Sequence, residues 1–490
     1  MSLPVSIAIL AGLYLYDFYD RRADAQNEKK YRPFPVPPPD RRRYGPRDVS
    51  LVVPTVDTEP TTFAACLETW ARCRPGEILV VTTEAQAAGV YELLSTAAKG
   101  VNNTDSTRIE LLTIEKPNKR HQLTRGIQAA RGEILALVDD DVRWESGGTL
   151  TSLLAPFEEG DVGLVGGPVD SYLPPDRRDP ATITPWEVAA LRLRANRHAR
   201  MKAAYVADGG INFCVSGVTM LARARMLRDD PLFRFAFVHE RWLGRRQNSG
   251  DDTFITRWCL FHHLLDHKAR RGEMVGQLRR DAAAAKMGSR GTEDGGSVNE
   301  EDEARFEQLL KVTELDTKRW RLGVQMTEEA TVPTYLKAGP EFVGQMKRWT
   351  RSGLRLRLTC LLFEPGIFKM YKTAPYMTRK MVECMFAAPL HWLFIACWFI
   401  CLKQAPALGV LILLYETYKW ADNLIGFVGQ FPYAAPYWWA AAVVEKVQLL
   451  SDLYCWLTLG TEAWETRNTD GDQEGDPRLL VDEIVHGKSC

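Results

Sequence analysis

Short apolar runs alternate with amphipathic segments between residues 49 and 138 of this 490-residue chain. Each run is rich in branched side chains and is too short for an ordinary helix, which indicates buried strands. The runs lie at 49–54, 76–81, 108–114 and 134–138. Because segments with helical periodicity separate them, the pattern predicts βαβ units around a mostly parallel sheet, and we expect an α/β fold.

Beyond residue 140 the pattern predicts further strands near 161–170 and 211–223, with a helix over Trp186–Lys202 between them. The stretch at about 270–303 is polar, glycine-rich and acidic toward its end, which is typical of a flexible insertion. We therefore expect one globular domain over residues 48–340, interrupted by this insertion.

An apolar stretch, Leu3–Tyr16, opens the chain. It is shorter than the roughly 20 residues that cross a bilayer as a helix, so residues 1–20 are interpreted as a membrane segment that either spans or lies in the interface. Residues 21–47 are basic and proline-rich, which indicates a linker on the cytoplasmic side. We expect the globular domain and the polar tail at 461–490 to be cytosolic.

The C-terminal third is basic and amphipathic over residues 341–380 and apolar over 381–460, which predicts interfacial helices followed by transmembrane helices. Met381–Leu402 is long enough to span a bilayer, and Ala405–Leu414 and Tyr437–Leu459 are further candidates. The number of crossings stays open. The sequence predicts an integral protein of the plasma membrane or the Golgi, in contact with membrane lipid.

Charge and cysteine content argue against several classes of protein. The 62 basic and 62 acidic residues give no net charge, so no overall field favours nucleic acid. Ten cysteines are scattered without CxxC pairs, which favours reduced thiols over a disulfide framework or a structural zinc site. A nicotinamide enzyme is disfavoured because no glycine-rich fingerprint follows the first predicted strand.

Three consecutive carboxylates follow the buried run at 134–138: Asp139, Asp140 and Asp141. Side chains alternate along an extended chain, so Asp139 and Asp141 are expected on one face. Open α/β sheets bind their ligands at the carboxyl ends of their strands, and hard oxygen ligands suit Mg²⁺ or Mn²⁺. Taken alone, an acidic loop at the end of a strand explains the same residues.

Two further polar groups have a chemical interpretation beside a structural one. Lys116 and Lys119 lie near the start of a predicted helix, where cations favour a metal-chelated nucleotide diphosphate. Asp251 and Asp252 follow Gly250 at another helix start. A carboxylate there is able to act as general base toward an alcohol, while helix capping accounts for it without chemistry.

The helix predicted after residue 340 carries Gln345, Arg348 and Trp349 on adjacent turns. An amide, a guanidinium and a large flat ring are together able to bracket a sugar or a diphosphate. An interfacial helix with tryptophan and arginine at the lipid headgroups is the competing interpretation.

Taken together, these stretches resemble the processive glycosyltransferases of family 2, which include the hyaluronan, cellulose and chitin synthases. The matching motifs are a DxD pair, an acceptor-base GDD, a QxxRW helix and a WGTR-like segment read here as WETR, in the same order. The residues concerned are Asp139 and Asp141, Gly250 to Asp252, Gln345 to Trp349, and Trp464 to Arg467. Finer features, such as CVSG at Cys214 to Gly217, are most similar to hyaluronan-synthase-like enzymes.

The resemblance implies a glycosyltransferase-A-type domain that uses Mg²⁺ or Mn²⁺ and a UDP-sugar to extend a polysaccharide, with inversion at the anomeric carbon. It implies that Asp139 and Asp141 bind the metal and that Asp252, beside Asp251, deprotonates the acceptor. The nucleotide-sugar would contact Asp57, Glu84, Lys116, Lys119, Asp139, Gln345, Arg348, Trp349, Trp464, Thr466 and Arg467; the acceptor would contact Cys214, Ser216, Gly217 and Trp349.

Two alternatives stay open from the sequence. One is non-processive transfer to a lipid or a short glycan, and the other is a catalytically silent membrane scaffold. The donor sugar, the linkage and the product length are not encoded by short motifs, because they depend on the shape of the pocket and its hydroxyl contacts.

Overall fold

A computed structural model describes residues 1–56, 59–100, 107–195, 197–265, 276 and 318–461. Its centre is a seven-stranded sheet with the strand order β10-β5-β7-β4-β1-β2-β3. The strands are β1 (Val49–Pro54), β2 (Glu77–Thr83), β3 (Arg108–Ile114), β4 (Ile134–Val138), β5 (Val162–Gly166), β7 (Thr219–Arg223) and β10 (Arg321–Val324). Only β7 runs antiparallel to its neighbours, β4 and β5. The predicted α/β fold with a mostly parallel sheet is confirmed.

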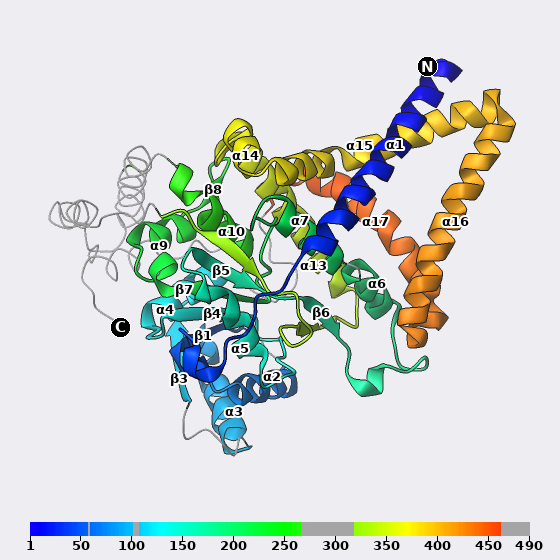
Figure 1. Ribbon diagram of the computed structural model, residues 1–490. Helices are drawn as coiled ribbons and strands as arrows, with labels where there is room; N and C mark the ends of the chain where they lie inside the picture. The colour runs from blue at the N-terminus through cyan, green and yellow to red at the C-terminus, as the bar shows by residue number, and fades with distance from the viewer. Residues whose placement is uncertain (57–58, 101–106, 196, 266–275, 277–317, 462–490) are drawn as a thin grey trace, which may run out of the picture.

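Helices cover both faces of this sheet, as Figure 1 shows. The layers contain α2 (Pro60–Arg72), α3 (Ala87–Gly100), α4 (Lys119–Ala129), α5 (Thr149–Leu154), α8 (Ala224–Leu227), α9 (Pro231–Val238) and α10 (Asp251–Phe261). The central strands are buried on both sides, which explains their continuous apolar sequence. Helix α4 lies so close to the sheet that a Cβ atom at Gly126 would be 2.3 Å from the Val52 side chain.

A second layer of chain joins the sheet to the C-terminal helices. It includes α6 (Pro185–Arg194), α7 (Arg197–Ala207), the parallel pair β6 (Val169–Tyr172) and β11 (Val332–Tyr335), and the hairpin of β8 (Arg241–Trp242) and β9 (Arg245–Arg246). A bridge between Val142 and Thr334 fixes β11 beside the loop that follows β4. Since α13 (Glu341–Leu358) begins shortly after β11, this contact brings α13 to the carboxyl end of the sheet.

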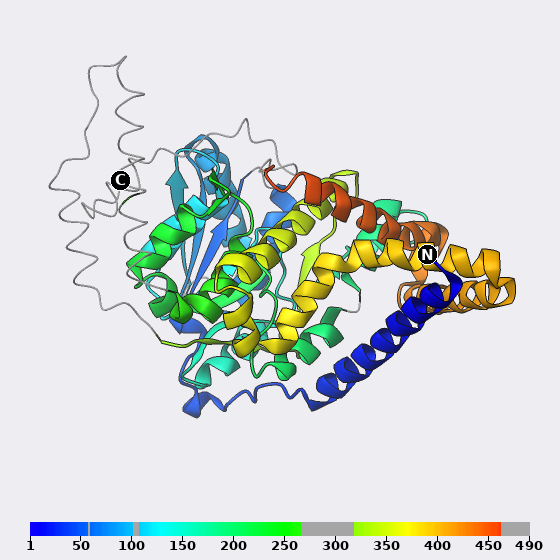
Figure 2. The same ribbon diagram turned by 90° about the horizontal axis from the view of Figure 1, so that it is seen from above.

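The remaining helices are α1 (Leu3–Lys30), α14 (Ile367–Thr373), α15 (Pro375–Gln404), α16 (Pro406–Gln430) and α17 (Trp438–Leu457). Figures 1 and 2 show α1, α15 and α16 extending away from the α/β part, with the N-terminus near the turn between α15 and α16. Helix α1 continues to Lys30, so the first ten residues of the expected extended linker at 21–47 are helical. Its second half is held by Lys380 on α15, which donates to Asp20 (2.6 Å) and Asp24 (3.1 Å).

Within the described residues, α15 is the one helix with the length and hydropathy to cross a membrane. The predicted spans Ala405–Leu414 and Tyr437–Leu459 fall on α16 and α17, which both present large exposed apolar side chains. Membrane embedding and the number of crossings stay predictions. The expected insertion at about 270–303 lies outside the described residues apart from position 276.

Candidate active site

The three aspartates that follow β4 line a cavity of about 100 Å³ at the carboxyl end of the sheet. The cavity is closed by α13, more than 190 residues further along the chain. Its other lining residues are Pro54, Val56, Lys119, Gln122, Arg194, Val218, Thr334, Lys337, Gln345, Arg348 and Trp349. The expected DxD pair and all three residues of the QxxRW motif therefore line one cavity.

Each aspartate has a different partner. The Asp139 carboxylate forms an ion pair with Lys119 Nζ at 2.8 Å, and Asp141 accepts a hydrogen bond from Thr334 Oγ1 at 3.2 Å. Asp140 is 2% exposed and accepts from Thr55 Oγ1 at 2.8 Å, which ties the end of β4 to the end of β1. We infer that Asp140 holds the loop in shape while its two neighbours remain beside the cavity.

Lys119 joins the first aspartate motif to the second. Asn118 caps α4 by accepting from the backbone amides of Arg120 and His121, and this sets Lys119 at the first helical position. The Lys119 Nζ lies 2.8 Å from Asp139 and 3.0 Å from Asp251. Burial would lower the pKa of Lys119, but the two carboxylates raise it above its ordinary value. No feature of the sequence predicted this bridge.

Asp252 lies against the CVSG loop. Its carboxylate accepts from the backbone amides of Thr253 (2.8 Å) and Gly217 (3.4 Å). A Cβ atom at Gly217 would be 3.2 Å from Asp252 Cβ, so this position favours glycine. Burial and then the charge of Asp251 raise the pKa of Asp252 to about 6, which suits a general base near neutral pH. The pKa of Asp251 lies below its ordinary value because Lys119 outweighs the effect of burial.

The CVSG loop is fixed from α10, where Thr256 Oγ1 accepts a hydrogen bond from the Val215 amide at 3.0 Å. Burial and the nearby Asp252 charge raise the pKa of Cys214 well above its ordinary value, so this thiol is protonated and is not a nucleophile. Ser216 Oγ accepts from the Val218 amide within the same turn. Two of the three predicted acceptor residues, Cys214 and Gly217, therefore contact Asp252.

Trp349 on α13 is half-buried, and part of its surface is already covered. It packs against a buried cluster that includes Phe342 and Val444, and the guanidinium carbon of Arg194 lies 5.0 Å from its ring centre. Sequence reasoning did not single out Arg194, because it belongs to a helix with several arginines and to no motif. Lys337, also on the cavity, lies between β11 and α13 and was missed because it belongs to no motif.

Other predicted residues are not brought to the cavity. Glu84 lies in a short 3-10 helix after β2 and Lys116 lies before α4, and neither lines the cavity. The residues of the base motif and the CVSG loop do not line it either: Asp251, Asp252, Cys214, Ser216 and Gly217. They are joined to the cavity through the contact of Lys119 with Asp251. Asp57, Trp464, Thr466 and Arg467 lie outside the described residues.

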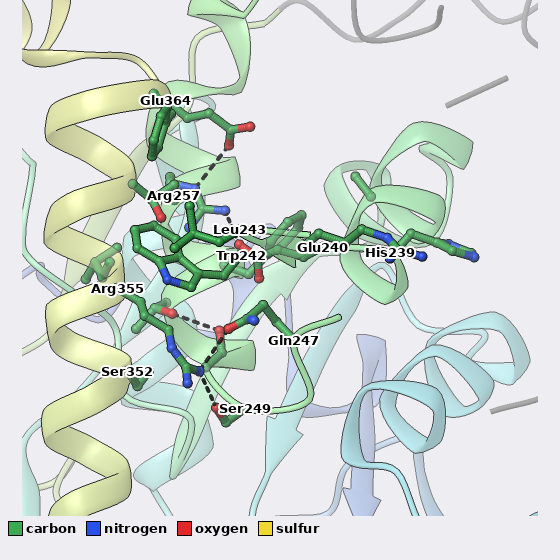
Figure 3. Close-up of a pocket in the computed structure, with 18 of the residues that line it drawn as sticks. His239, Glu240, Trp242, Leu243, Gln247, Ser249, Arg257, Ser352, Arg355 and Glu364 are labelled. Atoms are coloured by element: carbon green, nitrogen blue, oxygen red, sulfur yellow. Dashed lines mark hydrogen bonds and ion pairs between the residues drawn. The ribbon is translucent and has the colours of Figure 1, made fainter. Parts of the chain in front are cut away.

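A larger pocket of about 630 Å³ lies behind the base motif, between α9, α10 and α13 (Figure 3). Hydrogen bonds from two arginines hold the loop that precedes Asp251. Arg355 donates to Gln247 Oε1 at 2.8 Å and to Ser249 Oγ at 3.3 Å, and Arg120 donates to the Ser249 carbonyl at 2.8 Å. Glu240 in turn pairs with Arg120. The pocket therefore supports the site and contains none of the three aspartates after β4.

Known proteins resemble this chain over most of its length. Residues 46–264 match the family described as "Glycosyltransferase like family 2". The chain is 30% identical to the NDP-glycosyltransferase ltbB of Aspergillus luteorubrus over 465 residues, which cover 94% of this chain and 98% of that protein. It is 29% identical to a type 2 glycosyltransferase of Zymoseptoria tritici over 334 residues, 68% of this chain and 55% of that protein.

A solved structure shares the fold. The mannosyltransferase PcManGT from Pyrobaculum calidifontis, in complex with GDP-Man and Mn²⁺, matches with a TM-score of 0.50 at 15% identity, over 90% of this chain and 98% of that one. These comparisons give no support to the narrower resemblance to hyaluronan synthases, which stays a prediction. Because the 30% identity to a glycosyltransferase extends over nearly the whole of both chains, this protein belongs to glycosyltransferase family 2 and is a nucleotide-sugar transferase.

Proposed function

We propose that the enzyme transfers a sugar from a UDP-sugar to a hydroxyl group of a glycan acceptor, with inversion at the anomeric carbon and Asp252 as the base. The observation that carries this proposal is the double contact of Lys119 with Asp139 and Asp251, which brings the two aspartate motifs to one point. The cavity there is closed by the helix with Gln345, Arg348 and Trp349.

The residues at the site have two tasks: one removes the proton of the acceptor, and the others stabilise the negative charge of the departing diphosphate. Asp252, with its pKa of about 6, is ionised at neutral pH and accepts the proton of the attacking hydroxyl group. Arg348 and Lys337, which line the cavity, supply positive charge for a departing diphosphate. The CVSG loop holds the acceptor beside the base. No covalent enzyme intermediate is needed.

We propose Mg²⁺ or Mn²⁺ as the cofactor, held by Asp139 and Asp141. Among the described residues no group of three His, Cys, Asp or Glu side chains converges on one point. Two carboxylates nonetheless fit these ions, because Mg²⁺ ordinarily takes one or two carboxylates and completes its coordination with water and substrate phosphates. Such an ion would neutralise charge on the diphosphate.

The decisive experiment compares the wild-type protein with Asp252→Asn in purified membranes supplied with labelled UDP-sugars and Mn²⁺. We expect at least one sugar to enter a product with the wild-type protein and almost none with the variant. Asp229→Asn is the matched control, because within the described chain its carboxylate pairs only with the neighbouring Arg228 at the surface. Equal product from Asp252→Asn would remove Asp252 from the mechanism.

Polysaccharide extension by a membrane-embedded enzyme is the finer proposal. The exposed apolar side chains of α15, α16 and α17 support contact with lipid. Sizing of the labelled product separates extension from single transfer: a ladder or a long polymer supports extension, whereas one discrete product supports non-processive transfer to a lipid or a short glycan.

A further inference from the structure

The guanidinium of Arg194 is buried at the edge of the cavity, and its Nη1 atom has no hydrogen-bond partner in the described part of the chain. Its position is well fixed. Helix α6 begins with a capping box between Thr184 and Glu187, and the last residue of this helix, Arg194, lies over the ring of Trp349. The unpartnered donor is therefore not the free end of a flexible surface side chain.

An unpartnered buried charge destabilises a fold unless something else compensates for it. Burial lowers the pKa of Arg194 to about 10, so the side chain is still charged at neutral pH. The stacked Trp349 ring and the carboxyl end of α6 offset part of the cost, but neither satisfies Nη1. This is the state expected of a donor whose partner is a ligand.

The surroundings identify the charge of that ligand. Three cations line the cavity without an ion pair to any described residue: Arg194, Lys337 and Arg348. Lys119, by contrast, is already paired with Asp139 and Asp251. Arg194 lines the same cavity as Asp139 and Asp141, the carboxylates that would hold a divalent cation, and the charge of Asp141 raises the pKa of Arg194. Phosphate oxygens are the ligand chemistry that suits both a guanidinium and a divalent cation.

We propose that Arg194 binds an anionic oxygen of the donor diphosphate and stabilises it as it leaves, an assignment that rests on the proposed function. In that step the acceptor oxygen forms a bond to the anomeric carbon and gives its proton to Asp252. The bond from the anomeric carbon to the diphosphate oxygen breaks, and its electron pair stays on that oxygen. Arg194 donates to the diphosphate through Nη1.

The test measures binding of UDP, inorganic pyrophosphate and uridine to the full-length protein in detergent with Mn²⁺, for the wild-type protein and Arg194→Gln. Loss of one charge-assisted hydrogen bond corresponds to about a tenfold weaker binding. We expect that loss for UDP and pyrophosphate and no change for uridine. Arg194→Lys should lie between, because it keeps the charge without the planar fork.

Arg192→Gln is the matched control. Arg192 lies on the same helix and pairs with Glu445 on α17, outside the cavity, so its loss should leave binding of all three compounds unchanged. Thermal unfolding adds a readout that separates ligand binding from a structural role. Arg194→Gln should leave the midpoint unchanged or raise it, because it removes an unpaired buried charge; a clear fall would indicate a structural residue instead.

The outcomes separate the two proposals. If the wild-type protein binds pyrophosphate but no UDP or UDP-sugar, the proposed function fails. The assignment of Arg194 is then tested by comparing the pyrophosphate affinity of the wild-type protein with that of Arg194→Gln. Unchanged UDP and pyrophosphate affinity in Arg194→Gln overturns the assignment even if transfer is intact. The same holds if only the KM of the acceptor rises, since Arg194 would then bind an anionic acceptor. A wild-type protein that binds no phosphate compound contradicts both.

Discussion

Asp252 carries the clearest chemical signature at the scale of single residues. Its pKa of about 6 arises from burial and from the neighbouring Asp251 charge, and a carboxylate acts as a general base only when it is ionised. We therefore expect kcat/KM to rise with pH through about 6 and then level off. A rate profile between pH 5 and 8 checks this, and a flat profile across that range would contradict the assignment.

The same raised pKa predicts an effect on stability. An aspartate in the unfolded chain titrates near 3.9, so between roughly pH 4 and 6 the folded protein binds this proton more tightly than the unfolded one. Its contribution to stability is present at low pH and is lost as pH rises through about 6. Asp252→Asn should therefore raise the unfolding midpoint at pH 7 more than at pH 5. An equal shift at both values would count against the raised pKa.

Lys119 is the second residue whose removal has a specific consequence. Lys119→Met leaves the Asp139 and Asp251 carboxylates facing each other without a cation, and removing one partner from a largely buried pair costs a few kcal/mol, up to about 3–5. We expect a lower unfolding midpoint that Mn²⁺ partly restores, because the ion replaces the lost charge. Calorimetric scans with and without Mn²⁺ measure the unfolding midpoint of both proteins. A midpoint that the substitution does not change would show that the Lys119 bridge contributes nothing to stability.

Helix α13 connects two pockets at the scale of elements. Its first half brings Gln345, Arg348 and Trp349 to the cavity, while Arg355, two turns later, holds the loop before Asp251. Movement of this one helix would therefore alter the substrate contacts and the position of the base together.

Arg355→Lys tests the contact between α13 and the loop before Asp251. Lysine is unable to reproduce the four hydrogen bonds that Arg355 makes to Gln247, Ser249, Leu459 and Thr461. We expect kcat to fall about tenfold, the effect of losing about 1.4 kcal/mol of transition-state stabilisation, with little change in the affinity for UDP. Arg357→Lys on the same turn is the control, and an equal loss in both variants would point to a general weakening of α13.

Local pattern predicted the elements better than the contacts between them. The strand at 134–138 and its terminal aspartates follow from a short apolar run that ends in charge, and α4 and α10 follow from their helix starts. The Lys119 bridge and the stacking of Arg194 on Trp349 depend on how distant elements pack, which no periodicity encodes. The end of α1 was missed for the same reason, since its polar half is stabilised by Lys380 from α15.

At the scale of the whole molecule, the apolar helices form a unit of their own. Leu10 of α1 packs with Cys397 and Cys401 of α15 and with Ile412 of α16. Ion pairs from Lys380 to Asp20 and Asp24 lie at the end of this bundle nearer the α/β part. Helices α1 and α15 are thus held to each other at both ends, and α16 joins them at the outer end.

If the proposed membrane embedding holds, that arrangement restricts how the protein is oriented in a bilayer. Leu3 and Leu408 belong to one cluster at the outer tip, so the first residue and the α15–α16 turn must share a compartment, whichever one it is. Epitopes placed before Leu3 and between Gln404 and Pro406 should be equally accessible to an antibody or a protease in sealed vesicles. If one is protected and the other is cleaved, the tip seen here does not exist in the membrane.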